Sequence, residues 1–112
     1  MLTPAAPLDE LLPDAVFDLI KIDVQGFEPE VIAGMRQMLA RSPEPVIVSE
    51  LWPHALRERG LDPLALVRDY AEEFSVQVQV GRDLLVMKPA EVIRTCDQAG
   101  QAGQVNLVLT RK

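Results

Sequence analysis

The stretch Phe17 to Val24 reads FDLIKIDV and is followed by Gln25 and Gly26. Its apolar residues are too continuous for a strand with one face in water, so the pattern predicts a strand buried on both faces of a parallel sheet. Gly26 then indicates a turn, because glycine adopts the backbone angles that tight turns need. A parallel strand reaches its neighbour through a crossover, and the next residues provide one.

A helix is expected directly after this turn. Glu28 and Pro29 are typical of a helix start, and the helical pattern continues through Arg41. Its apolar side chains share one face: Val31, Ile32, Met35, Met38 and Leu39. Two prolines end this helix, and the segment Pro45 to Leu51, PVIVSEL, predicts a second strand. A strand, a helix and a strand of these lengths form a unit with parallel strands, which predicts the α/β class.

The rest of the chain predicts two helices and three strands. The expected helices cover Asp62 to Phe74 and Pro89 to Ala99, and the expected strands cover Ser75 to Val80, Leu84 to Met87 and Val105 to Thr110. The segment SVQVQV at Ser75 to Val80 alternates strictly, so we expect a strand near a sheet edge with one less buried face. Gln98 to Gln104 is expected to be a flexible loop.

Length and composition limit the classes of function. A chain of 112 residues is one domain at most, and its 48% hydrophobic residues suffice for a core. A net charge of -6 with scattered Lys and Arg disfavours nucleic-acid binding. The single Cys96 and the single His54 exclude an internal disulfide and a zinc site built from such residues. No stretch has the pattern of a membrane span or signal peptide, so we expect a soluble, cytoplasmic protein without a membrane partner.

Polar residues end both predicted parallel strands, at the sheet edge where open α/β folds bind ligands. Asp23 lies two residues after Lys21, and it caps the next helix, pairs with Lys21 or belongs to a site. Lys21 is expected to pack its stem and reach a partner with its ammonium group. Glu28 fits a helix N-terminal carboxylate better than a base. Glu50 fits a site residue and a structural salt bridge equally well.

The loop expected after the second strand contains two ring side chains. His54 has an ordinary pKa of about 6.5, which suits a proton acceptor, although a lone histidine also serves as a surface or packing residue. Trp52 either stacks on a flat ligand or anchors packing. Cys96 is expected to be a small buried hydrophobe. The motifs GxGxxG, GxxxxGK and GxSxG do not occur in the sequence.

Four segments together resemble the FkbM-type methyltransferase family. They are LDELL at Leu8 to Leu12, DLIKIDVQGFEPEVIAGM at Asp18 to Met35, VIVSELWPHALRERGLDP at Val46 to Pro63, and VNLVLT at Val105 to Thr110. The resemblance implies a Rossmann-like class I methyltransferase sheet in which this chain provides strands four to seven. It also implies that the last strand is antiparallel and inserted between the fifth and the sixth.

The resemblance also implies a reaction. Relatives take a methyl group from S-adenosylmethionine, here to a hydroxyl oxygen of a small-molecule or glycan acceptor, by in-line displacement. Asp23 or His54 would be the catalytic base or an orienting group. Glu28, Glu50 and Trp52 would lie on the substrate side. No metal is implied.

The chain departs from the family pattern in two ways. Gln25 stands where relatives usually carry Glu. The family's first half, with its glycine-rich loop and ribose-binding acid, is not matched, so residues 1–112 are expected to be a C-terminal portion that is inactive alone. The alternatives are a non-catalytic half-domain that associates through an exposed strand edge, with itself or with a partner chain, and a small α/β binding module.

Overall fold

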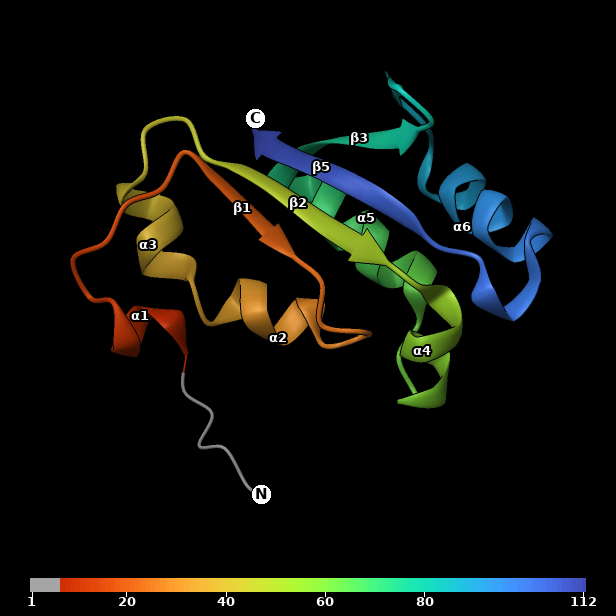
Figure 1. The fold of residues 1–112 in the computed structure, drawn as a ribbon, viewed down its shortest axis with the longest axis horizontal. Helices are drawn as coiled ribbons and strands as arrows, with labels where there is room; N and C mark the ends of the chain where they lie inside the picture. The colour runs from red at the N-terminus through yellow and green to blue at the C-terminus, as the bar shows by residue number, and fades with distance from the viewer. Residues whose placement is uncertain (1–6) are drawn as a thin grey trace.

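A computed structural model describes residues 7–112 and contains one mixed sheet (Figure 1). Its strands are β1 (Leu19–Ile22), β2 (Val46–Leu51), β3 (Phe74–Val80), β4 (Asp83–Leu85) and β5 (Val105–Arg111). The spatial order is β1-β2-β5-β3-β4. β1 and β2 are parallel, and β5 runs antiparallel to both β2 and β3. The predicted α/β class and the inserted antiparallel last strand are therefore confirmed.

Six α-helices accompany the sheet within the described residues. They are α1 (Leu8–Leu11), α2 (Glu28–Ala33), α3 (Arg36–Arg41), α4 (Pro53–Glu58), α5 (Pro63–Glu73) and α6 (Pro89–Gln98). Figure 1 shows α5 passing behind β2 and β5. A short 3-10 turn, Gly100–Ala102, lies in the segment expected to be a flexible loop. No helix among residues 7–112 is long and apolar enough to cross a membrane.

The core lies between the helices and one face of the sheet. Along β2, Ile47 is 1% exposed, whereas its neighbours Val46 and Val48 are only half-buried. Strand alternation places paired residues on the same face, and Leu109, the partner of Ile47 on β5, is fully buried. The apolar face of the sheet is thus covered by helices, while no described element covers the other face.

This arrangement corrects the prediction for the first strand. The stretch from Phe17 to Val24 was expected to be buried on both faces, but β1 is shorter, and its residue Leu19 is 63% exposed. Only the side facing the helices is dry, as Ile22 at 4% exposure shows. The prediction is wrong because no described element packs over the second face of β1, which is also an edge strand with β2 as its one sheet neighbour.

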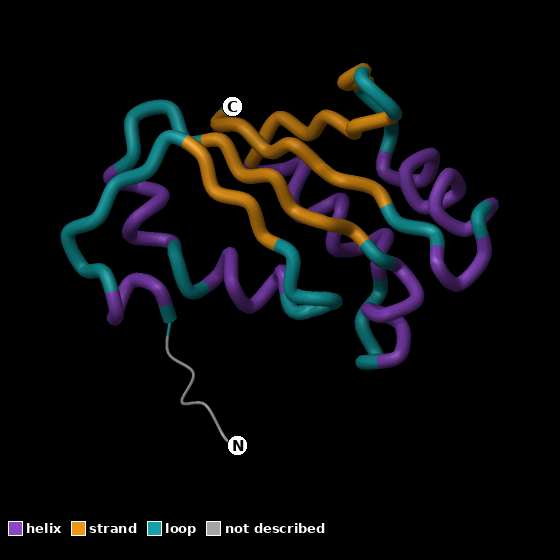
Figure 2. The backbone as a smooth tube through the Cα atoms, viewed as in Figure 1, coloured by secondary structure: helices purple, strands orange, loops and turns teal. Residues whose placement is uncertain are grey.

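The single helix expected up to Arg41 is broken at Gly34 and Met35 into α2 and α3 (Figure 2). The break has a tertiary cause. The carboxylate of Asp9 accepts hydrogen bonds of 2.8 Å from the backbone N–H groups of Gln37 and Met38, so it caps α3 from outside. The amide of Asp9 in turn donates to the carbonyl of Gly34 at 2.9 Å. Of the expected apolar stripe, Val31 is half-buried, and the other four residues, Ile32, Met35, Met38 and Leu39, are buried.

At the sheet ends the structure differs from two predictions and confirms a third. His54 was expected in a loop but lies in the first turn of α4, which begins at Pro53, a residue suited to that position. The return strand expected at Leu84 to Met87 is Asp83–Leu85. The expected position of Ser75 to Val80 near a sheet edge is confirmed, because only β4 lies outside β3.

A pair of leucine substitutions tests whether only one sheet face is covered. Leu109→Ala should lower the free energy of unfolding by about 2 to 5 kcal/mol, because it leaves a cavity in the core. Leu19→Ala removes the same atoms from an exposed position, so we expect a loss of about 0.5 kcal/mol or less. Urea denaturation at a common m-value measures both. Equal losses would contradict the open face.

Candidate functional site

The turn after β1 is held by a buried carboxylate. Gln25 and Gly26 have φ angles of 54° and 99°, the left-handed region that only glycine adopts without cost. The side chain of Glu28, 3% exposed, accepts hydrogen bonds from the N–H of Val24 at 3.0 Å and the N–H of Gly26 at 2.9 Å. Charge-assisted bonds of this kind are strong, so Glu28 stabilises the strained turn. The two carboxylate oxygens of Glu28 therefore face the backbone of the turn.

Gly26 also permits a close approach between the turn and α4. A Cβ atom on Gly26 would lie 3.3 Å from Cβ of Ala55. Arg59 binds the same region, because its guanidinium donates to the Gly26 carbonyl and lies 4.0 Å from the ring centroid of Phe27. Arg59 also pairs with Glu30 at 2.6 Å. The turn is thus fixed from both sides.

Three carboxyl groups meet where β1 and β2 end. Oxygen atoms of Asp23, Glu28 and Glu50 all lie within 4.8 Å of one another. The side-chain amide of Gln25 bridges two of them, because its Nε2 donates to Asp23 Oδ1 at 2.9 Å and to Glu50 Oε1 at 3.3 Å. The structure therefore brings together the acidic residues that the sequence singled out at these strand ends. Lys21 forms no ion pair with Asp23 within 4.0 Å.

Burial and the neighbouring acids change the protonation of Glu50. Burial raises the pKa of Glu50 to about 7, Asp23 and Glu28 add to this rise, and Lys21 opposes it. A second negative charge beside an existing one is unfavourable, so one proton tends to stay on such a pair. A group with this pKa can take up or release a proton at neutral pH.

His54 and Trp52 lie beside this cluster in sequence, but they have other partners. His54 Nε2 is 3.0 Å from Oε1 of Glu58, one helical turn along α4. Trp52 Nε1 donates a 2.6 Å hydrogen bond to the carbonyl of Gln101. The two rings are neighbours, with centroids 6.2 Å apart. No hydrogen bond joins either side chain to Asp23 or Glu50 within residues 7–112.

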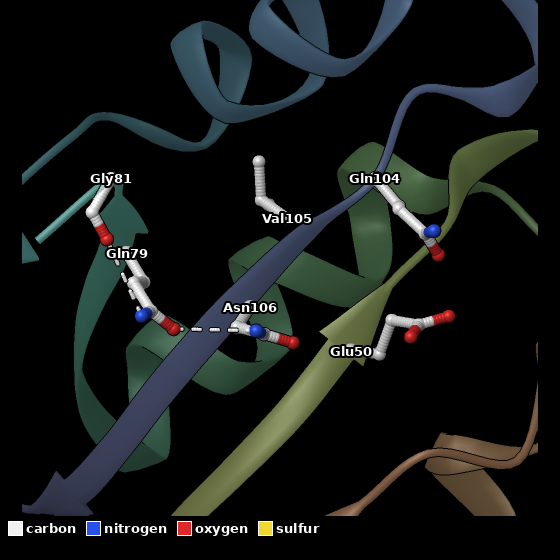
Figure 3. A pocket seen from close by; sticks show the side chains of 6 residues that line it. All are labelled: Glu50, Gln79, Gly81, Gln104, Val105 and Asn106. Atoms are coloured by element: carbon white, nitrogen blue, oxygen red, sulfur yellow. Dashed lines mark hydrogen bonds between the residues drawn. The ribbon is translucent and has the colours of Figure 1, made fainter.

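A hollow of about 300 Å³ lies next to Glu50, where β2 and β3 end and β5 begins (Figure 3). Its lining consists of Glu50, Gln79, Gly81, Gln104, Val105 and Asn106. Asn106 Nδ2 donates to Gln79 Oε1 at 3.2 Å, and Gln79 Nε2 donates to the Gly81 carbonyl at 3.4 Å. Sequence reasoning missed these amides. The available signal was the polar position in each alternating strand, Gln79 in SVQVQV and Asn106 in VNLVLT.

The three carboxyl groups also have the chemistry of a cation site, since Mg²⁺ and Ca²⁺ take oxygen ligands. Both oxygens of Glu28, however, already accept backbone N–H groups. A metal ion would compete with the bonds that hold the turn. The arrangement therefore fits a hydrogen-bonded acid pair, Asp23 and Glu50, better than a metal centre.

Glu28→Gln tests the role of the buried carboxylate. A glutamine amide offers one acceptor atom instead of two and turns its NH₂ group towards a backbone donor, so we expect unfolding to become easier by about 1 to 3 kcal/mol. Glu30→Gln removes an exposed ion-pair partner from the same helix and should cost less than about 1 kcal/mol. Thermal or urea unfolding compares the two variants. A smaller effect at Glu28 than at Glu30 would refute the role.

The pKa of Glu50 makes a second prediction. Because it rises from 4.5 in the unfolded chain to about 7 in the fold, the folded state holds more protons between these values. The contribution of Glu50 to the free energy of unfolding should therefore fall as pH rises through this window. Glu50→Gln should flatten that part of the pH profile. Carboxyl NMR titration should also show a lower pKa of Glu50 in Asp23→Asn, and an unchanged value would remove Asp23 as a cause.

Comparison with known proteins agrees with the resemblance described above. The family model of the Methyltransferase FkbM domain matches residues 2–78, more than half of the 112 residues. The match includes Asp23, Glu28 and Glu50 but ends before Gln79, Gln104 and Asn106. No curated protein and no solved structure matches the chain. The chain therefore belongs to the FkbM methyltransferase family.

Proposed function

We propose that this chain provides the acceptor side of a methyl transfer from S-adenosylmethionine to a hydroxyl oxygen of a small molecule or glycan. The observation that carries the proposal is the acid pair of Asp23 and Glu50, bridged by Gln25. The hollow gives a ligand access to Glu50, the member of this pair that lines it. Membership of the FkbM methyltransferase family supports methyl transfer as the chemistry.

The described residues do not by themselves fit S-adenosylmethionine. A nucleotide-type cofactor usually approaches glycine backbone in a turn that opens a helix. Gly26 is the glycine after β1, but Ala55 fills the space beside it, and Glu28 already binds its N–H. Gly60, Gly81 and Gly100 have open surroundings, but none of them follows a parallel strand and directly opens an α-helix. We therefore assign these residues no part in holding the methyl donor.

In the proposed reaction, the acid pair takes up the proton of the acceptor's hydroxyl group. A hydroxyl group in the hollow would hydrogen-bond to ionised Glu50, and its proton would pass to the carboxylate as the oxygen bonds to the methyl carbon and the bond from that carbon to the donor's sulfonium sulfur breaks. Asp23 would share that proton with Glu50, and Gln25 would keep both carboxyl groups in position. Of the two bases expected from the sequence, Asp23 belongs to the pair, whereas His54 has Glu58 as its neighbour.

A second candidate function is association without catalysis. One edge of β1 has no strand partner among residues 7–112, and Leu19 on its open face is 63% exposed. Such an edge can pair with a further strand, from a second copy or from a partner chain. In that case Asp23 and Glu50 would have a structural role and no catalytic one.

Calorimetric titration with S-adenosylmethionine separates autonomous catalysis from a half-site. We expect no stoichiometric binding by the chain alone, because the described residues form no complete site for the donor. Sedimentation in the same buffer measures self-association. Stoichiometric binding by the monomer would refute the half-site proposal.

A fusion to the cofactor-binding half of another family member tests the acceptor side directly. We expect methyl transfer to a hydroxyl compound, and Asp23→Asn should lower kcat by roughly 10² to 10⁴ while the fold is retained. Asp69→Asn, an exposed carboxylate on α5, is the matched control and should leave kcat unchanged. Normal turnover in Asp23→Asn would exclude Asp23 from the mechanism and favour the association function.

A further inference from the structure

The hollow beside Glu50 is lined mainly by side-chain amides. Gln79 comes from β3, Asn106 from β5 and Gln104 from the residue before β5, and Figure 3 shows them on both sides of the β5 ribbon, with Glu50 beyond. They meet because β5 lies between β2 and β3 and runs in the opposite direction. Its first residues therefore reach the edge at which the parallel strands end.

These amides retain hydrogen-bonding capacity towards a ligand. A carboxamide offers two N–H donors and an acceptor oxygen. Asn106 uses one N–H for Gln79, which leaves the other N–H and its oxygen. The side chain of Gln104 forms no hydrogen bond to another residue in the described part of the chain, and Figure 3 shows its amide on the same side of the β5 ribbon as Glu50. Neighbouring hydroxyl groups, which both donate and accept, complement such a set.

The charges around the hollow exclude other ligand classes. None of its six lining residues is basic, and its one ionisable group is the carboxyl of Glu50. A phosphate or carboxylate ligand would meet the like charge of Glu50, which no residue of the lining offsets; the nearby Lys21 acts on Glu50 from outside the lining. An apolar ligand would cover several amides without giving them partners, which costs free energy for each buried group. A neutral ligand with several hydroxyl groups avoids both penalties.

We propose that this hollow, formed by Gln79, Gln104, Asn106 and Glu50, binds a neutral polyhydroxylated compound of the sugar or polyol class. The inference rests on the proposed function in one respect, because it makes this compound the acceptor of the methyl group. The binding itself requires neither methyl donor nor turnover. Its volume of about 300 Å³ is at the lower end of ligand pockets, which suits one small ring.

The test uses the full chain and NMR of its side-chain NH₂ groups. D-glucose and myo-inositol serve as neutral probes, glucose 6-phosphate as the anionic probe, and cyclohexanol as the ring with a single hydroxyl group. We expect saturable shifts of the NH₂ signals of Gln79, Gln104 and Asn106 with at least one neutral probe. Glucose 6-phosphate and cyclohexanol should bind at least about tenfold more weakly. No saturable shift with either neutral probe, or tighter binding of glucose 6-phosphate, would overturn the proposal.

Variants identify the residues responsible. Asn106→Ala should weaken binding of the neutral probe by about tenfold, since it removes a donor and an acceptor. Gln104 lies outside the strand, so Gln104→Ala should weaken binding of the neutral probe without the risk that Asn106→Ala disturbs the fold. Gln77→Ala is the matched control, because Gln77 lies on the same face of β3 but does not line the hollow. An equal loss in Gln77→Ala would overturn the assignment.

The outcomes separate this inference from the proposed function. If the chain binds a sugar but the fusion protein transfers no methyl group, the proposed function is contradicted and the proposed binding site is supported. Methyl transfer without any binding of a neutral polyol in the hollow would remove only the present inference.

Discussion

The two hydrogen bonds that Glu28 accepts from the backbone of the β1 turn are the interaction on which the rest of the site depends. They hold Gln25 and Gly26 in a left-handed conformation. That conformation directs the amide of Gln25 between Asp23 and Glu50. The packing of Gly26 against α4 follows from the same turn. A carboxylate that was expected to stabilise a helix start therefore organises the junction between two strands and a second helix.

The open face of the sheet is the second constraint. Helices cover one side, so each strand contributes its alternate residues to the core, and the others remain available to solvent or ligands. The polar residues at the carboxyl ends of β2 and β3, Glu50 and Gln79, are on this open side, as is Asn106 of β5. The same lack of cover exposes Leu19 on β1. The association hypothesis rests on a separate feature, the edge of β1 that pairs with no further strand among residues 7–112.

Local patterns predicted the parts of the fold that local chemistry determines. The strand, helix and strand order and the polar ends at Asp23 and Glu50 were predicted correctly. The break at Gly34 was not, because its cause is Asp9, some 25 residues away in the chain. The burial of β1 was also wrong, since a single strand carries no information about whether a layer covers its second face. The amide-lined hollow was missed because it exists only after β5 inserts between distant strands.

Glu50 connects the two parts of the site. One of its oxygens accepts a hydrogen bond from Gln25 within the acid pair, and the same residue lines the hollow. Burial is the largest cause of the raised pKa of Glu50. A ligand that displaces water from the hollow buries Glu50 further and should therefore raise this pKa more. Ligand binding should then favour the protonated pair, and by linkage protonation should favour the ligand. A neutral Glu50 can donate a hydrogen bond to a hydroxyl oxygen, whereas the ionised form only accepts and is the form that can take the acceptor's proton. Under the proposed function, ligand binding and proton transfer therefore place opposite demands on Glu50, and its pKa of about 7 keeps both forms accessible at neutral pH.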